Sequence, residues 1–253
     1  MRQPIRGICV WAALATVGTG QTFEVASIKV SELFRRGGEG SRRMDIQAVP
    51  GSVTMRNVGV PQAIVWAYKV SPFQITNIQG LDFPDRYDIL AKSSRPAKTD
   101  EMRVMMQALL AERFKLAVHR ETKEMSAYAL VEAKGGHKLT PASAEDGPGV
   151  SPMQGKLALG GKAATLDQLA LFLADPLHAP VIDTTGLKGR YDFSFDLSGY
   201  VPQGPRQPGE PEPDPVSILQ NALQKQLGLK LEARKMPVEM LVIDHVEKAP
   251  VEN

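Results

Sequence analysis

The chain has 253 residues, 43% of them hydrophobic and 23% charged, a balance that supports a buried core and excludes both wholesale disorder and a small disulfide-stapled scaffold. Lys and Arg number 30 against 28 Asp and Glu, and two of the basic residues, Arg2 and Arg6, lie in the first twenty positions. The rest of the chain therefore lacks the basic field of a nucleic-acid-binding protein, and we expect no nucleic-acid partner.

Residues 1–20 have the order of a secretory signal peptide, with a basic start, an apolar run from Gly7 to Leu14 and small residues at the end. A buried first element is the alternative, but the run is shorter than the roughly 20 apolar residues of a membrane span. We expect a secreted or periplasmic protein with no stable membrane span after cleavage. Cys9 is the only cysteine and would leave with the signal, so the mature chain would hold no disulfide or thiolate.

After the signal, FEVASIK from Phe23 alternates polar and apolar residues and predicts a strand, and extended structure resumes from Met44 to Val49. The intervening loop places four arginines around three glycines, namely Arg35, Arg36, Arg42 and Arg43. It lacks the ending of a phosphate-binding loop, so we expect no nucleotide cofactor. The four arginines form either a solvated loop or a ligand-binding patch, because guanidinium groups suit phosphate and carboxylate.

From Val53 onward the chain repeats itself. VTMRNVGVPQAIVWAY and the later RYDILAK match LGGKAATLDQLALFLA and RYDFSFD, with Gln62 equivalent to Gln168 and Arg86-Tyr87-Asp88 equivalent to Arg190-Tyr191-Asp192. The apolar spacing after Thr165 predicts a capped helix, and the flanking residues predict strands. Each copy is expected to be a strand-helix-strand-strand unit.

A second unit also recurs. MMQALLAERFKLAVHRETKEMSAYALV, from Met105, resembles ILQNALQKQLGLKLEARKMPVEMLVI, from Ile218. We expect a helix that starts near Thr99, a strand through Phe114, Leu116 and Val118, and a return strand around Tyr128 in a hairpin. The twin begins at Asp214-Pro215, a cap residue followed by proline. This unit is interpreted as helix-strand-strand.

The whole chain is therefore interpreted as an α+β fold, a tandem duplication of these two small units with mainly antiparallel sheets. The first half covers residues 21–134, a polar linker covers 135–155, and the second half covers 156–253. The second half contains a proline-rich linker over 197–214, interpreted as a spacer or as a ligand for a partner domain.

FEVASIK, QALLAERFKLAVHRETKEMSAYALV, VIDTTGLKGRYDF and LVIDHVEK together resemble a family of exported, soil-associated bacterial proteins that carry a domain of unknown function. The resemblance spans nearly the whole mature chain and implies export and the fold. Some members resemble extensions of membrane-bound sensor metallopeptidases. ATLDQLALFL and VIDTTGLKGRYDFSFD are more distantly similar to the short N-terminal domains of secretins and TonB-dependent receptors, which bind proteins or peptides in the periplasm.

The chemistry-bearing residues form no recognisable catalytic motif. Thr185-Gly186-Leu187-Lys188 lies in a repeated turn and is interpreted as turn chemistry. No metal site is expected, because the histidines have no ligand spacing; they are His119, His137, His178 and His245. The repeated Asp88 and Asp192 could be a glycosidase-like pair, but an ion pair with Arg86 or Arg190 is the structural alternative.

We therefore expect a non-enzymatic module that binds a protein, peptide or cell-envelope ligand through sheet edges or loops, without cofactor or metal. One alternative is an envelope hydrolase whose first suspects are Asp88, Asp183 and Asp192. Another is a sensor domain that works beside a membrane peptidase, which only the family resemblance suggests.

Overall fold

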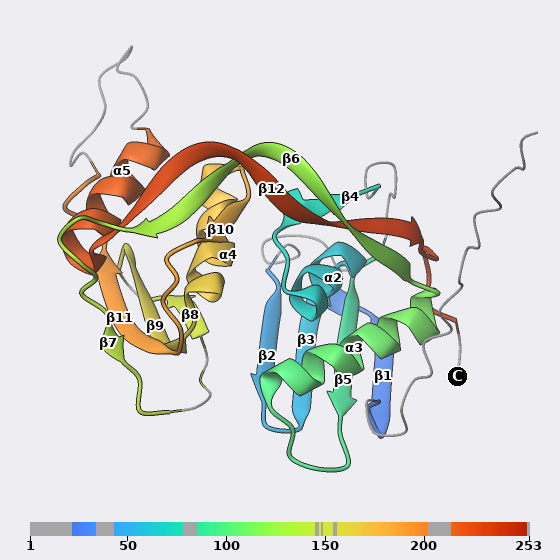
Figure 1. Cartoon of the computed structure of the whole chain (residues 1–253). Coiled ribbons are helices and arrows are strands. Elements are labelled where there is room, and N and C mark those ends of the chain that lie inside the picture. The colour runs from blue at the N-terminus through green and yellow to red at the C-terminus, as the bar shows by residue number, and fades with distance from the viewer. Residues whose placement is uncertain are drawn as a thin grey trace, which may run out of the picture.

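The computed structural model describes residues 22–33, 43–77, 85–144, 147, 149–153, 156–201 and 214–251. These residues confirm the α+β class, with mostly antiparallel sheets arranged as two lobes joined by an arch of two long strands (Figure 1). The proposed signal peptide with Cys9, and most of the proline-rich segment, lie outside the described residues. No helix of the described chain has the length and apolar character needed to span a membrane.

Lobe 1 is a four-stranded antiparallel sheet with two helices on one face. Its strands, in sheet order, are β1 (Val25–Val30), β5 (Tyr87–Lys92), β3 (Ser52–Val58) and β2 (Asp45–Val49). The helices are α2 (Val60–Tyr68) and α3 (Thr99–Phe114). Alternate strand residues such as Met55 and Ile89 are buried against the helices, so the opposite face of the sheet is open to solvent.

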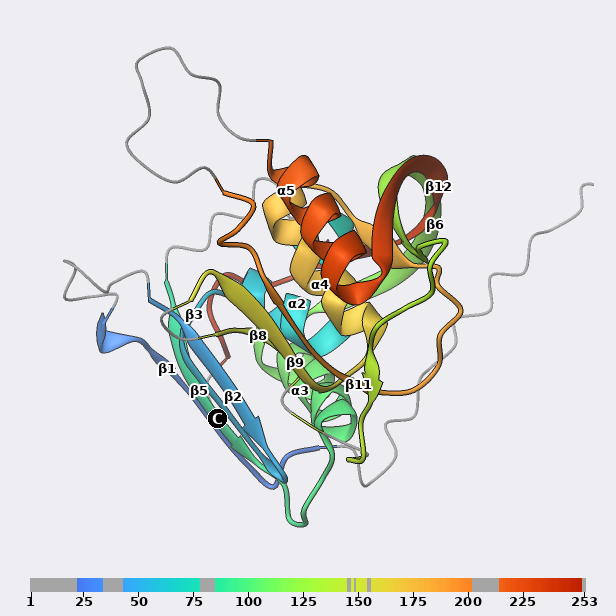
Figure 2. The same ribbon diagram turned by 90° about the vertical axis from the view of Figure 1, so that its left-hand side faces the viewer.

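Lobe 2 has the same plan. Its strands, in sheet order, are β7 (Thr140–Pro141), β11 (Tyr191–Asp196), β9 (Ala158–Ala164) and β8 (Gly149–Pro152). Its helical elements are α4 (Leu166–Leu177), α5 (Pro215–Ala222) and the π-helical turn η2 (Leu223–Leu227). Seen from the side of lobe 2, α4 lies between α5 and strands β8 and β9 (Figure 2).

Strands β7 and β8 fall within residues 135–155, which the sequence suggested as a polar linker. The two strands are short, and Val150 is their only large aliphatic residue, so they carry no alternating apolar pattern. Val150 nevertheless packs against the core of lobe 2. Thr140–Pro141 and Gly149–Pro152 of this segment are thus part of the sheet.

The arch consists of β6 (Ala117–Glu132) and β12 (Leu229–His245), which pair antiparallel along their whole length. The expected hairpin inside the second unit is wrong, because β6 runs on as one strand and pairs with β12 instead. Most of its first half, from His119 to Glu124, is exposed and polar, a pattern that is also typical of a turn. Helix followed by one long strand is the observed unit.

Each lobe is completed by the strand that arrives from the other half of the chain. The end of β12 brings Leu241 and Ile243 into the core of lobe 1, where β4 (Ile75–Thr76) pairs with it in parallel. The end of β6 brings Leu130 into the core of lobe 2, where β10 (Val181–Asp183) pairs with it in parallel. The arms are therefore exchanged between the lobes.

The exchange follows an approximate two-fold symmetry. Sheet order β1-β5-β3-β2 in lobe 1 recurs as β7-β11-β9-β8 in lobe 2. In the third sheet, β10-β6-β12-β4, the symmetry exchanges β6 with β12 and β10 with β4. Glu124 pairs with Pro237. Glu124 follows Leu116 by the same number of residues as Pro237 follows Leu229, the equivalent of Leu116 in the second copy. The symmetry axis therefore passes through the middle of the arch.

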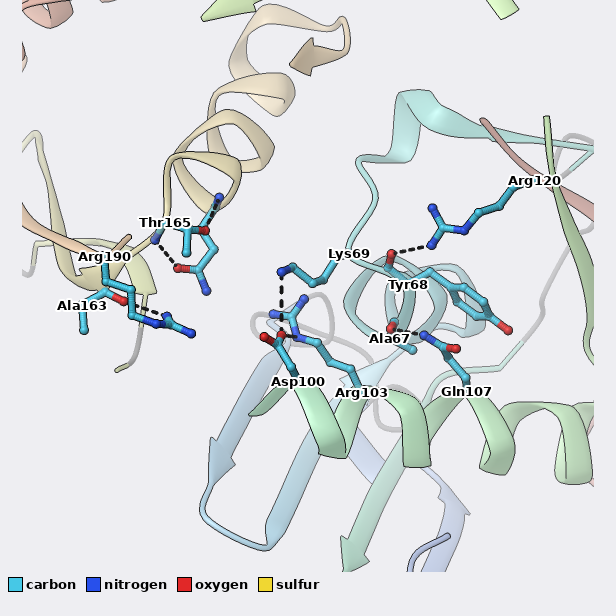
Figure 3. A network of polar contacts seen from close by, with 11 residues as sticks. Ala67, Tyr68, Lys69, Asp100, Arg103, Gln107, Arg120, Ala163, Thr165 and Arg190 are labelled. Carbon is cyan, nitrogen blue, oxygen red and sulfur yellow. Dashed lines mark hydrogen bonds and ion pairs between the residues drawn. The ribbon is translucent and has the colours of Figure 1, made fainter. Parts of the chain in front are cut away.

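Side chains hydrogen-bond to the free backbone groups at the helix ends. Some of these side chains were expected from the sequence and others were not. Thr165 Oγ1 accepts a hydrogen bond from Gln168 N at 3.3 Å, and Gln168 Oε1 accepts one from Thr165 N at 3.0 Å (Figure 3). The free C-terminal carbonyls of α2 accept hydrogen bonds from other elements: Ala67 O from Gln107 at 2.8 Å and Tyr68 O from Arg120 at 3.4 Å.

Candidate functional site

The first Arg-Tyr-Asp triplet, Arg86-Tyr87-Asp88, holds one residue of the neighbouring strand in an unusual conformation. Asn57, in β3, has φ 55° and lies where the register between β3 and β5 shifts. Its backbone N–H donates to Asp88 Oδ1 at 2.8 Å, and its carbonyl accepts from Arg86 Nη1 at 3.2 Å. The two charged groups thus bind both polar groups of a strained residue.

The second triplet does the same work in lobe 2. Ala163 has φ 44°, and its N–H donates to Asp192 Oδ1 at 2.9 Å. Its carbonyl accepts from Arg190 Nη1 at 2.8 Å (Figure 3). The repeated letters therefore serve a repeated backbone clamp. In each triplet the Arg and the Asp both hydrogen-bond to Asn57 or Ala163, and both tyrosines are buried as expected.

The three carboxylates suspected of catalysis are not brought together. Asp88, Asp183 and Asp192 lie on β5, β10 and β11, which belong to three different sheets. Asp183 Oδ1 accepts hydrogen bonds from the backbone N–H and the hydroxyl of Thr185, at 2.9 and 2.7 Å. This confirms turn chemistry for the Thr185 segment.

Each of the four histidines has a local contact. His119 Nδ1 lies 2.9 Å from Asp244, and His245 Nε2 lies 3.1 Å from Glu247 Oε1. His137 stacks edge-on against Tyr191, and His178 against Phe73. Among the described residues, no three His, Asp or Glu side chains are placed to hold a metal ion.

Of the four loop arginines nominated for ligand binding, only Arg43 lies within the described residues. Its backbone carbonyl accepts a hydrogen bond from Asn57 Nδ2 at 2.9 Å, next to the clamp of lobe 1. Arg35, Arg36 and Arg42 lie outside the described part of the chain. The arginine patch therefore stays a prediction.

A hollow with a volume of about 740 Å³ lies on the outer face of the lobe 2 sheet. Its floor consists of Ser151, Gly160 and Ser194, which pair across β8, β9 and β11. The floor is low because all three side chains are small. Next to it, Gly161 gives Phe193 room to pack, since a Cβ there would lie 2.4 Å from the ring.

The walls of the hollow come from both ends of the sheet. Pro152, Met153 and Lys156 line the side near β8, while Lys138, Gln226 and Leu227 line the side near η2. Gln226 is fixed by two hydrogen bonds to the backbone of Asp196, at 2.9 and 2.8 Å. The η2 wall is therefore tied directly to β11.

The lining is basic, with Lys138, Lys156 and Lys162 and a single carboxylate, Asp192. The hydrogen bond from Ala163 N–H, followed by the one from Lys162 Nζ at 3.1 Å, lowers the pKa of Asp192. Asp192 therefore stays ionised and offsets Lys162. The remaining lysines give the hollow a positive surplus.

The equivalent place in lobe 1 carries larger side chains among the described residues. The row that corresponds to Ser151, Gly160 and Ser194 consists there of Gln47, Thr54 and Leu90. These longer side chains cover the face of the sheet, and Leu90 is 42% exposed. The glycine pair in LGGKAAT, set against Thr54-Met55 of the first copy, was the sequence signal for the hollow, and sequence reasoning missed it.

Comparisons with known proteins identify a family but no characterised relative. No curated protein matches the chain. No solved structure matches it either. The model of a family described as a protein of unknown function, DUF3738, matches residues 61–246, a stretch that includes lobe 2, the whole arch and the part of lobe 1 that follows β3. The chain therefore belongs to the DUF3738 family.

Proposed function

We propose that this protein is an exported, non-enzymatic binding module whose ligand surface is the basic hollow of lobe 2. The observation that carries the proposal is the divergence of the two copies. Their clamps are retained, whereas the row on the outer face changes from Gln47, Thr54 and Leu90 to small residues in lobe 2. A hollow of about 740 Å³ also falls in the size range of ligand pockets.

The chemistry of the carboxylates supports binding rather than hydrolysis. Carboxylate catalysis needs two acidic groups about 5 to 10 Å apart in one cleft. Asp88 and Asp192 each bind a backbone N–H in a different lobe, and Asp183 holds the turn at Thr185. All three carboxylates therefore stabilise the backbone of the fold through hydrogen bonds.

The free edges of the arch are poor sites for adding a partner strand. Its exposed middle carries Lys123 and Glu124 on β6, and Lys235 and Pro237 on β12. Charged side chains and proline at an edge oppose pairing with another chain. The proposal therefore narrows from sheet edges and loops in general to the hollow.

Export is the other part of the proposal. It rests on the signal-like order of residues 1–20 and on the resemblance to exported, soil-associated bacterial proteins. The partner would then be a protein, peptide or other ligand of the periplasm, the cell envelope or the outside of the cell.

The test exchanges the outer faces of the two lobes. Gly160→Thr with Ser194→Leu gives lobe 2 two residues of the lobe 1 row, and a Cβ at Gly160 would meet only the Met153 side chain, at an ordinary 3.5 Å from Cγ and 3.8 Å from Sδ. The matched control, Thr54→Gly with Leu90→Ser, changes lobe 1 instead. Each immobilised protein is incubated with a cell-envelope extract, and the retained molecules are identified by mass spectrometry.

We expect the wild type and the lobe 1 control to retain the same partner, and the refilled variant to lose at least about 90% of it, a tenfold change equivalent to about 1.4 kcal/mol. Circular dichroism checks that all three proteins are folded. Equal capture by the refilled variant, or no specific capture by the wild type, contradicts the proposal.

A further inference from the structure

We infer that the ligand of the hollow is an acidic segment of another polypeptide, which extends past Lys138 into a second basic pocket. The inference rests on the proposed function and names the ligand class for the same site. It depends on how the hollow continues along the surface of lobe 2.

The second pocket, of about 360 Å³, adjoins the hollow and shares Lys138 with it. It is built where the turn after β6 crosses the turn before β12. A Cβ on Gly228 would lie 2.1 Å from Gly136 O, so the two backbones touch. Glu132 Oε1 accepts a hydrogen bond from His137 N at 2.8 Å and fixes this turn.

The two pockets together present a strong excess of positive charge. Their linings contain one carboxylate, Asp192, and five lysines, namely Lys134, Lys138, Lys156, Lys162 and Lys230. Lys230 and Lys162 are offset by Glu232 and Asp192. Lys134 makes no ion pair with any residue in the described ranges. An anionic ligand would gain most near Lys134 and Lys138.

Lys138 lies at the junction of the two pockets, and a hydrogen bond fixes its ammonium group there. Its Nζ donates one hydrogen bond to Lys225 O, at 2.7 Å, in the middle of η2. An ammonium group has three N–H donors, so two are left for an anion. The carbonyl fixes the charge between the pockets, where a chain that runs from one to the other must pass.

The other lining residues favour a polypeptide over other polyanions. Pro152, Met153 and Leu227 give the hollow an apolar component, which polyphosphate would not use. Ser151, Ser194 and Gln226 offer hydrogen-bonding groups that suit peptide amides. Neither lining contains an arginine, the residue best suited to bidentate phosphate recognition. An acidic peptide with apolar residues uses both components.

The experiment uses the mature chain and a labelled peptide of about ten alternating Glu and Leu residues, which spans roughly 33 Å when extended. The matched probe replaces every Glu by Gln. Polyphosphate and vesicles that contain anionic lipid test the other polyanions. Binding is followed by fluorescence anisotropy or sedimentation at low and at physiological salt.

We expect the Glu peptide to bind at least about tenfold more tightly than the Gln peptide, with affinity that falls as salt rises. Lys134→Gln, on an exposed side chain, should weaken the Glu peptide several-fold, and Lys134→Gln with Lys138→Ala about tenfold or more. Arg56→Ala, at the lobe 1 equivalent of Lys162, is the control and should bind as the wild type does.

Equal affinity for the two peptides, or tighter binding of polyphosphate or vesicles, would overturn the inference. The failure can be told apart from failure of the proposed function. If the refilled variant still loses its envelope partner while the acidic peptide does not bind, the hollow remains the ligand site and only the ligand class is wrong. If the refilled variant keeps its partner, both fail.

Discussion

The two lobes share a scaffold and differ in the surface that they present. Each has the same strand order, a left-handed residue gripped by an Arg and an Asp, and an arm received from the other half of the chain. The outer face of lobe 1 carries Thr54 and Leu90, whereas that of lobe 2 is lowered by Gly160 and Ser194. The difference teaches that residues repeated in the two copies build the scaffold here, whereas residues that differ between them give lobe 2 its hollow.

Because the arms are exchanged, we do not regard the two lobes as independent domains. Lobe 1 needs Leu241 and Ile243 from β12, and lobe 2 needs Leu130 from β6. Removing either arm would open a core to water. We therefore expect the lobes to unfold together.

The largest expected effect comes from truncating a buried leucine in lobe 2, with unfolding followed by the fluorescence of a tryptophan in lobe 1. Leu169 on α4 is 0% exposed, and Leu169→Ala should lower the free energy of unfolding by about 2 to 5 kcal/mol. In a chain that starts at residue 21, Trp66 on α2 is the only tryptophan, so its fluorescence reports on lobe 1. Urea unfolding followed by Trp66 and by circular dichroism should give one shared, lowered midpoint.

Leu110→Ala, which removes an equally buried leucine from α3, is the matched change in lobe 1. It should also shift both signals together. A Trp66 signal that ignores Leu169→Ala would show two independent lobes and break the account of the exchanged arms.

The clamps should respond alike in the two lobes. Arg86→Ala and Arg190→Ala each remove a charged donor from the carbonyl of a left-handed residue, and each should cost about 1.5 to 3 kcal/mol of unfolding free energy. Denaturant unfolding of the two variants measures the effects side by side. A loss below about 0.5 kcal/mol in either variant would mean that its clamp does not support the fold.

The smallest effect is the acid dependence of the lobe 2 clamp. The N–H of Ala163 and the Lys162 ammonium keep the pKa of Asp192 below its ordinary value of 3.8. The unfolded chain therefore takes up the proton first as pH falls, and stability is lost from about pH 4 downward, through the lowered pKa. Asp192→Asn should flatten that part of the curve of unfolding free energy against pH. An unchanged slope would show that Asp192 makes no such contribution.

Much of the scaffold was predictable from the sequence. Thr165 with Gln168, and Asp214 before Pro215, are local cap signals, and they begin helices as expected. The repeats gave the two-fold plan, because equivalent apolar positions fill equivalent cores. The clamp was not predictable, because its acceptor and donor are backbone groups of Asn57 and Ala163, and alanine, unlike asparagine, has no preference for a left-handed backbone.

The arch and the hollow were not predicted from the sequence, for different reasons. The polar middle of β6 lies in solvent, so it shows no strand periodicity, and its partner β12 is about a hundred residues away. The hollow depends on small side chains from β8, β9 and β11 and on lysines that only the tertiary fold brings together. The glycine pair Gly160-Gly161 was the one local sign of the hollow, and it does not show which other residues line it.

The most direct measurement places a photo-crosslinking amino acid at Ser194 in lobe 2 and, in a second protein, at the equivalent Leu90 in lobe 1. Both chains are expressed in the native host and irradiated in living cells. We predict a specific crosslinked species from position 194 and none from position 90. Equal crosslinking at the two positions, or crosslinking only at position 90, would contradict the assignment of the ligand surface to lobe 2.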